Sequence, residues 1–180
     1  QEQDYDMWRQ LGNVGWGWND VLPYFLKAEN QEHGSSEFHN GHGPLSVSDQ
    51  RIRLDILDEF MNAAEEMGIP KVNDFNKGDN FGCGYFQVTV KNGLRCSASV
   101  AYLNPIKKRN NLKIEVNAHV KNIDFEKKKA TGISYWKNNN LIKVKAKKEV
   151  ILSAGSIGSP HILQVSGIGD SSKLKKFGIN

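Results

Sequence analysis

The feature that most constrains this chain is a junction near its C-terminal end, "EVILSAGSIGSPHILQVSGIG", which runs from Glu149 to Gly169. The continuous apolar run in "EVILSAG" is typical of a strand buried on both faces of a parallel sheet. The small residues after it lead into a predicted helix, with Ser159 or Ser156 as its cap and Pro160 in its first turn. In open α/β sheets, ligands bind beyond the carboxyl ends of the strands.

Two interpretations of this junction follow from the residues alone. Tiny side chains at Ala154, Gly155 and Ser156 let a ligand approach the backbone, and free helix amides favour an anion or a polar ring edge. Alternatively, the small residues serve only to pack a tight turn. The chain contains no G-x-G-x-x-G fingerprint, so this segment by itself does not bind a dinucleotide in the usual way.

The rest of the chain mixes helices and strands. The first predicted helix has Asn19 as its cap and Pro23 in its first turn, and the second is closed by Gly68. A long loop, rich in Asn, Asp and Gly, follows over 68–82 and is typical of a lid or binding loop. Periodicity predicts helices over 20–30, 54–67 and a short stretch before Pro105, and strands over 44–48, 83–93, 112–116, 119–126, 130–137 and 140–155.

Composition and charge narrow the functional classes. The net charge of +4 comes from scattered lysines, which favours solvated turns over a nucleic-acid surface. No stretch approaches the roughly 20 apolar residues of a membrane span. Cys83 and Cys96 match no metal or redox spacing, so we expect free thiols in a reducing, cytoplasmic compartment.

Histidines and tryptophans invite functional interpretations. His39 and His42 are three residues apart in a glycine-broken loop without a third ligand, so we expect hydrogen bonds to the backbone rather than a metal site. For the tryptophans we expect core packing rather than a stacking platform. They are Trp8, Trp16 and Trp18.

The segment "GSIGSPHILQVSGIG" resembles the signature of the glucose-methanol-choline (GMC) family of FAD-dependent oxidoreductases. The resemblance covers nearly the whole chain: "FHNGHGPLSVSD" is similar to a family stretch, and the segment from "GYFQVTVKNG" to "NNLKI" is similar to bacterial choline and aliphatic alcohol dehydrogenases. The residues that fit the signature are Gly155, Ser156, Ser159, Pro160, Ile162, Leu163, Ser166, Gly167, Ile168 and Gly169.

The resemblance implies a mixed α/β (α+β) fold that is incomplete. It would comprise part of a Rossmann-like FAD-binding domain, with a β-hairpin or meander insertion, and part of a substrate or cap domain. The implied divisions are 1–36, a helical aromatic segment packing on the FAD domain, 37–94 in the substrate domain, and 95–180 in the FAD domain. Tyr85 and Phe86 would either line the substrate cover or pack in the core.

The resemblance also implies site residues. Val120 matches a valine whose backbone meets the adenine ring of FAD, and the remaining FAD contacts would be Ala154, Gly155, Ser156 and Ser159. No metal is expected. The family's catalytic histidine lies outside the matched region, so this chain alone would be an inactive internal fragment. None of the chain's own histidines stands at the catalytic position: His33, His39, His42, His119 and His161.

The expected function is that of a fragment of an FAD-dependent oxidoreductase. The full-length enzyme would oxidise a small primary alcohol, of choline or aliphatic type, by hydride transfer to the flavin, with oxygen or a quinone-type carrier as electron acceptor. It would be cytoplasmic or peripheral to the inner membrane. The alternative is a non-catalytic truncated product or a binding module that reuses the fold.

Overall fold

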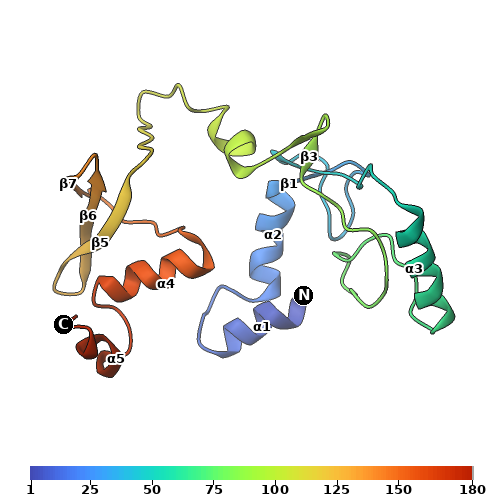
Figure 1. Ribbon diagram of the computed structural model, residues 1–180, viewed down its shortest axis with the longest axis horizontal. Coiled ribbons are helices and arrows are strands. Elements are labelled where there is room, and N and C mark those ends of the chain that lie inside the picture. The colour runs from blue at the N-terminus through green and yellow to red at the C-terminus, as the bar shows by residue number, and fades with distance from the viewer. Residues whose placement is uncertain (180) are drawn as a thin grey trace. The chain divides into compact units, whose positions relative to one another are not determined.

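The computed structural model describes residues 1–179, which form two compact units divided between residues 112 and 113 (Figure 1). Asn180, the end of the third expected division, lies outside the described residues. The expected domain divisions after residues 36 and 94 concern the complete family fold and stay predictions. No helix in the described part of the chain is long and apolar enough to cross a membrane.

The first unit combines three α-helices with short strands. Strand β1 pairs in parallel with β2, with Glu29 opposite Leu45, and β3 pairs with β4 around the predicted Asn92-Gly93 turn. Both turn residues have positive φ, as a type I′ turn requires. The bounds are α1 Glu2–Gln10, α2 Trp18–Ala28, β1 Glu29–Gln31, β2 Leu45–Val47, α3 Asp55–Glu66, β3 Val90–Lys91, β4 Leu94–Arg95 and the π-helix η1 Ser99–Leu103.

The predicted helices of this unit are present, with corrections at their ends. Helix α3 ends at the predicted place, where Gly68 adopts a φ of +85°. The prediction of Asn19 as a cap is wrong, because α2 already begins at Trp18 and the carboxylate of Asp20 accepts from the amide of Gly17 at 3.0 Å. Pro23 therefore lies in the second turn rather than the first. Helix α1 lies in the segment 1–36 that the resemblance implies to be helical, although periodicity does not predict it.

The three tryptophans cluster around Tyr5; within the described residues Trp18 is half-buried and Trp8 and Trp16 are not buried, so core packing is not seen for these two. Trp8 and Trp16 pack with ring centroids 6.1 Å apart, and Tyr5 lies 5.3 Å from Trp8 and 6.0 Å from Trp18. Trp8 and Trp16 nevertheless keep 47% and 55% of their surface exposed.

The second unit is built on a three-stranded antiparallel meander, β5-β6-β7, against which α4 packs. The predicted strands 119–126 and 130–137 and the start of 140–155 are confirmed, and the core contains Ile123, Ser134 and Tyr135. Glu115 pairs with Lys113 and Lys137 beside the meander. The bounds are β5 His119–Glu126, β6 Lys129–Lys137, β7 Asn140–Lys145, α4 Gly155–Val165 and α5 Ser171–Lys176.

Two predicted stretches of strand are not formed in the described residues, 112–116 and the "EVILSAG" part of 140–155, and of the predicted strand 83–93 only Val90–Lys91 is a strand. An extended segment becomes a strand only when a neighbour pairs with its backbone, and no described segment pairs with either. Ile151 accordingly exposes 78% of its surface. The expected position of Pro160 is also wrong, since α4 begins at Gly155 and the proline lies in its second turn.

Candidate functional site

The predicted junction folds into a tight turn at the start of α4. The backbone amide of Ala154 donates to the hydroxyl of Ser159 at 3.0 Å, so this serine fastens the residue ahead of the helix. It does not cap the first turn, and neither does Ser156, because no side chain caps α4. Gly155 has a φ of +82°, and a Cβ built on it would meet nothing within 4 Å.

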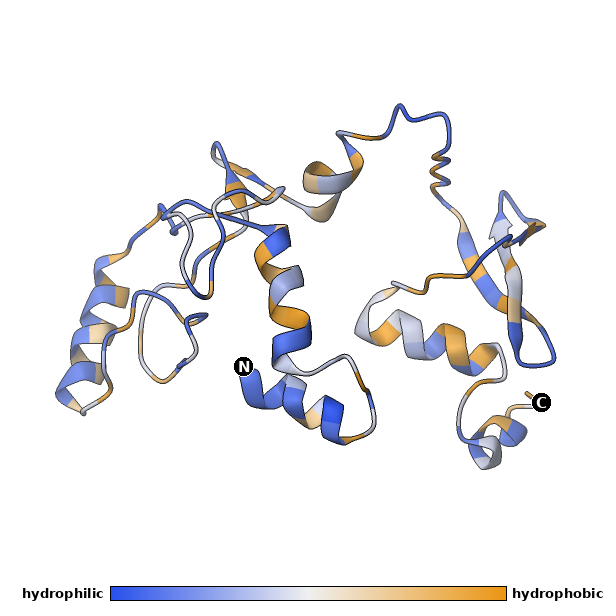
Figure 2. Ribbon diagram, turned by 180° about the vertical axis from the view of Figure 1, so that it is seen from behind, coloured by the Kyte–Doolittle hydropathy of each residue, from blue (hydrophilic) through white to orange (hydrophobic). Residues whose placement is uncertain are grey.

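The surroundings of Gly155 leave the backbone open to an approaching group. The first amides of α4 lack intrahelical acceptors, which is the general condition for anion binding at a helix N-terminus. Apolar residues stand on both sides of the turn, Ile151 before it and Ile157 after it, and the segment that leads into α4 is orange close to the helix in Figure 2. The junction therefore presents open backbone and free amide donors together.

Val120 lies on β5, half-buried and opposite Tyr135, next to an irregularity in the register between β5 and β6. No hydrogen bond joins it to the junction within residues 1–179. The connection runs through the other end of α4. The amide of Ile123 donates to the hydroxyl of Ser166 at 2.8 Å, and this hydroxyl donates to the carbonyl of Ile162 at 2.6 Å. One serine thus ties the helix to the strand.

The end of α4 explains why glycine follows that serine. Gly167 has a φ of +88°, its amide donates to the carbonyl of Gln164 at 3.0 Å, and the amide of Ile168 donates to that of Leu163 at 2.9 Å. These two bonds form a Schellman motif, which favours glycine at the left-handed position. The "Ser-Gly-Ile-Gly" sequence therefore both ends the helix and attaches it to β5.

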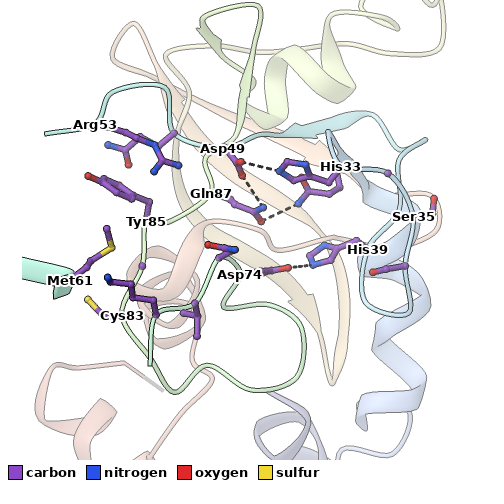
Figure 3. A pocket seen from close by; sticks show the side chains of 18 residues that line it. His33, Ser35, His39, Asp49, Arg53, Met61, Asp74, Cys83, Tyr85 and Gln87 are labelled. Atoms are coloured by element: carbon purple, nitrogen blue, oxygen red, sulfur yellow. Dashed lines mark hydrogen bonds and ion pairs between the residues drawn. The ribbon is translucent and has the colours of Figure 1, made fainter. Parts of the chain in front are cut away.

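The first unit holds a cavity of about 650 Å³ (Figure 3). A chain of polar side chains lies along one wall: the amide of Gln31 donates to Gln87 at 3.0 Å, and Gln87 donates to Asp49 at 3.3 Å. His33 contacts the other oxygen of Asp49 at 3.0 Å. Partial burial raises the pKa of Asp49, but the hydrogen bonds from Gln87 and His33 outweigh it and leave the pKa lowered. The side-chain oxygen of Gln31 is buried without a partner.

Tyr85 lines this cavity, in line with the expectation that it lines a cover rather than with the alternative that it packs in the core. Its hydroxyl donates to Asp58 of α3 at 2.9 Å, and the guanidinium of Arg53 lies 4.9 Å from its ring centroid. Phe86 does not pack in the core, because it is 69% exposed and contacts Phe75 with the centroids 4.9 Å apart.

His39 bonds to carboxylates, so the expectation of backbone hydrogen bonds is wrong. Its Nδ1 lies 2.9 Å from Glu29 and its Nε2 lies 2.8 Å from Asp74, while His42 is exposed. The sequence offered no direct signal for this arrangement, since Asp74 is 35 residues away.

The described residues contain one cluster with the geometry of metal ligands, Glu32, His33 and Asp49. Arg51 already donates to the carboxylate of Glu32, so a cation neutralises this group within the chain itself.

Comparison with known proteins decides the family. A family described as GMC oxidoreductase matches residues 1–180, the entire chain. The chain belongs to the GMC oxidoreductase family. The family resemblance carried by "GSIGSPHILQVSGIG" is thereby confirmed.

Several curated GMC relatives are dehydrogenases. Mitochondrial choline dehydrogenase from Homo sapiens is 40% identical over 98% of this chain, and oxygen-dependent choline dehydrogenase from Vibrio vulnificus is 42% identical over 98%. Alcohol dehydrogenase [acceptor] from Pseudomonas putida is 38% identical over 99%. The matched region is 30%, 32% and 33% of these proteins, so the chain spans about a third of their length.

Solved GMC structures share the fold over the whole chain. An FAD-dependent oxidoreductase from Chaetomium thermophilum has a TM-score of 0.88 and 32% identity, with 34% of its own chain covered. Pyridoxine 4-oxidase from Mesorbium loti also has a TM-score of 0.88, with 26% identity and 36% of its chain covered. The mixed helix-and-strand fold expected from the resemblance, as part of a larger fold, is confirmed.

Sequence reasoning identified the junction but missed how it is held. The sequence places Ser166 in the signature, but its hydrogen bond to Ile123 depends on the packing of α4 on β5, which the sequence does not show. A serine directly before a helix-ending glycine was the available signal. The polar wall of the cavity in the first unit gave no comparable signal, because its members are dispersed along the chain.

Proposed function

We propose that the full-length protein containing this chain is an FAD-dependent oxidoreductase that oxidises a primary alcohol of choline or aliphatic type. The observation that carries the proposal is the open junction at Gly155, which lies in a chain that matches the GMC family from end to end. The relatives named as choline and alcohol dehydrogenases support the substrate class.

In this proposal, the second unit holds the adenine side of FAD. The backbone of Val120 would contact the adenine, while Ala154, Gly155 and Ser156 would offer open backbone and amide donors to the dinucleotide. Ser159 keeps the turn in shape through its bond to the amide of Ala154. When bound, the flavin accepts the hydride that leaves the alcohol carbon.

The proton of the alcohol needs a base that this chain does not supply in the proposal, because none of its histidines stands at the family's catalytic position. The cavity of the first unit would belong to the substrate side, with Tyr85 on its wall. Oxygen or a quinone-type carrier would reoxidise the flavin. We place the enzyme in the cytoplasm or at the inner membrane surface.

The test uses a pair of glycine variants in the full-length protein. Gly155→Ala places a Cβ on open left-handed backbone at the proposed FAD contact, and Gly12→Ala does the same in the first unit, where φ is +99° and nothing lies within 4 Å. The backbone strain of about 1–2 kcal/mol is similar in both. We expect weaker FAD binding only in Gly155→Ala. Equal FAD affinity in both variants would contradict the assigned contact.

The alternative, a non-catalytic product or binding module, makes a different prediction for the unmodified protein. Such a protein would be colourless after purification and would not be reconstituted by FAD. A flavin spectrum that bleaches when choline or an aliphatic alcohol is added without oxygen would exclude it.

A further inference from the structure

The segment between α3 and β3 forms a loop, residues 70–83, that is closed at its base by backbone hydrogen bonds. The amide of Val72 donates to the carbonyl of Cys83 at 2.9 Å, and the amide of Cys83 donates to that of Pro70 at 2.9 Å. Beyond this base the loop contains no helix or strand. Five of its residues line the cavity of the first unit: Lys71, Val72, Asn73, Asp74 and Cys83. Whatever holds the loop therefore shapes one wall of that cavity.

A buried histidine holds the loop through Asp74. His39 is 8% exposed, and its Nε2 lies 2.8 Å from the Asp74 carboxylate while its Nδ1 lies 2.9 Å from that of Glu29, the first residue of β1 (Figure 3 shows the bond to Asp74). Both carboxylates are themselves only 19% exposed. The imidazole thus connects a loop without secondary structure to strand β1, which is itself paired with β2.

This bridge is fully satisfied only when the imidazole is protonated. A neutral imidazole has one N–H and one lone pair, so it can donate to one carboxylate but not to both. The imidazolium donates to both and neutralises part of their charge. Burial lowers the pKa of His39, but the hydrogen bonds and charges of Glu29 and Asp74 outweigh burial and raise it above the ordinary value.

The charged groups that act on His39 are Glu29 from β1 and Asp74 from the loop. His33 and Asp49, which line the same cavity, pair with each other at 3.0 Å. Folding raises the pKa of His39. The stability that protonated His39 contributes is therefore complete below the ordinary histidine pKa, and it is lost as the pH rises through the raised value.

We propose that His39 is a pH-sensitive latch that fastens the 70–83 loop to β1 when protonated and releases Asp74 when it loses its proton. Both carboxylates also accept a backbone amide, Asp74 from Asn76 within the loop at 2.8 Å and Glu29 from Asn40 at 3.3 Å. Asp74 is the side that is released, because it lies in a loop without helix or strand, whereas Glu29 lies on a paired strand. The inference is independent of FAD and of the proposed alcohol chemistry.

The test is hydrogen–deuterium exchange of the loop amides in the full-length protein, from about pH 6 to about pH 9, across the range in which histidines titrate. Exchange from an opening of constant stability rises roughly tenfold per pH unit, because hydroxide catalyses it. We expect the peptide covering 70–83 to accelerate more steeply than this as His39 loses its proton. An unchanged tenfold rise would overturn the proposal.

Matched variants separate the latch from general unfolding. His42→Gln changes an exposed histidine three residues away and should keep the steep rise, whereas His39→Gln should abolish it. Asp74→Asn leaves the imidazole with one carboxylate, and we expect a loop that exchanges faster already at the acidic end and follows the ordinary slope. A steep rise that persists in both His39→Gln and Asp74→Asn would overturn the latch.

Discussion

Replacing Ser166 by alanine should loosen β5 from α4 without changing any exposed surface of the junction. The hydroxyl receives the amide of Ile123 and donates to Ile162, so its removal leaves one strand amide without an acceptor. Ile123 is 7% exposed, and water therefore does not readily replace the lost partner. The perturbation acts on the attachment of the helix rather than on the meander itself.

The magnitude follows from the group left unsatisfied. A buried backbone amide without an acceptor costs about 1–3 kcal/mol. Because every 1.4 kcal/mol corresponds to a factor of ten, the protection of the Ile123 amide should fall roughly 5- to 150-fold. Strands β6 and β7 keep the backbone hydrogen bonds that pair them with each other, so the protection of their amides from exchange should change much less.

The assay is hydrogen–deuterium exchange of the peptide that covers β5, compared among Ser166→Ala, Ser166→Thr and Ser171→Ala. Threonine keeps a hydroxyl and should restore most of the protection, and Ser171 is an exposed serine at the start of α5. Exchange in Ser166→Ala that is no faster than in Ser171→Ala would refute the reasoning.

Three further predictions concern separate sites. Partial burial and the hydrogen bond to Asp58 raise the pKa of Tyr85, so its ultraviolet titration should move toward the ordinary tyrosine value in Asp58→Asn, and an unmoved midpoint would contradict this. The pKa of Glu115 is lowered to about 2 by its two lysine partners, so NMR titration should show these ion pairs persisting until the pH falls through that value, rather than through the ordinary glutamate range. Gly132→Ala would place a Cβ 2.2 Å from the carbonyl oxygen of Val144, so exchange should accelerate in β6 and β7, and unchanged protection would show that the strands adapt.

Elements with local signals were predictable from the sequence. Helix α3 follows from apolar spacing and a closing glycine, and the meander follows from alternation and polar turns. The strand expected over 112–116 and the "EVILSAG" part of the strand expected over 140–155 are not formed, because pairing partners decide whether an extended segment is a strand. The relatives are about three times as long as this chain, so much of their fold has no counterpart here.

The candidate site was predictable in part. The small residues around Gly155 predict an open turn. In the structure Gly155 has a left-handed backbone, which a ligand contact there would use. The role of Val120 stays a prediction. The bridge through His39 could not be predicted from the sequence, because Glu29 and Asp74 lie 10 and 35 positions away and only the folded loop brings them together.

The account rests most directly on whether the full-length protein is a flavoprotein that oxidises alcohols. The decisive measurement is the absorbance spectrum of that purified protein before and after anaerobic addition of choline or an aliphatic alcohol. We predict a flavin spectrum that bleaches with one of these alcohols. A colourless protein that FAD cannot reconstitute, or a bound flavin that none of them reduces, would contradict the proposed function.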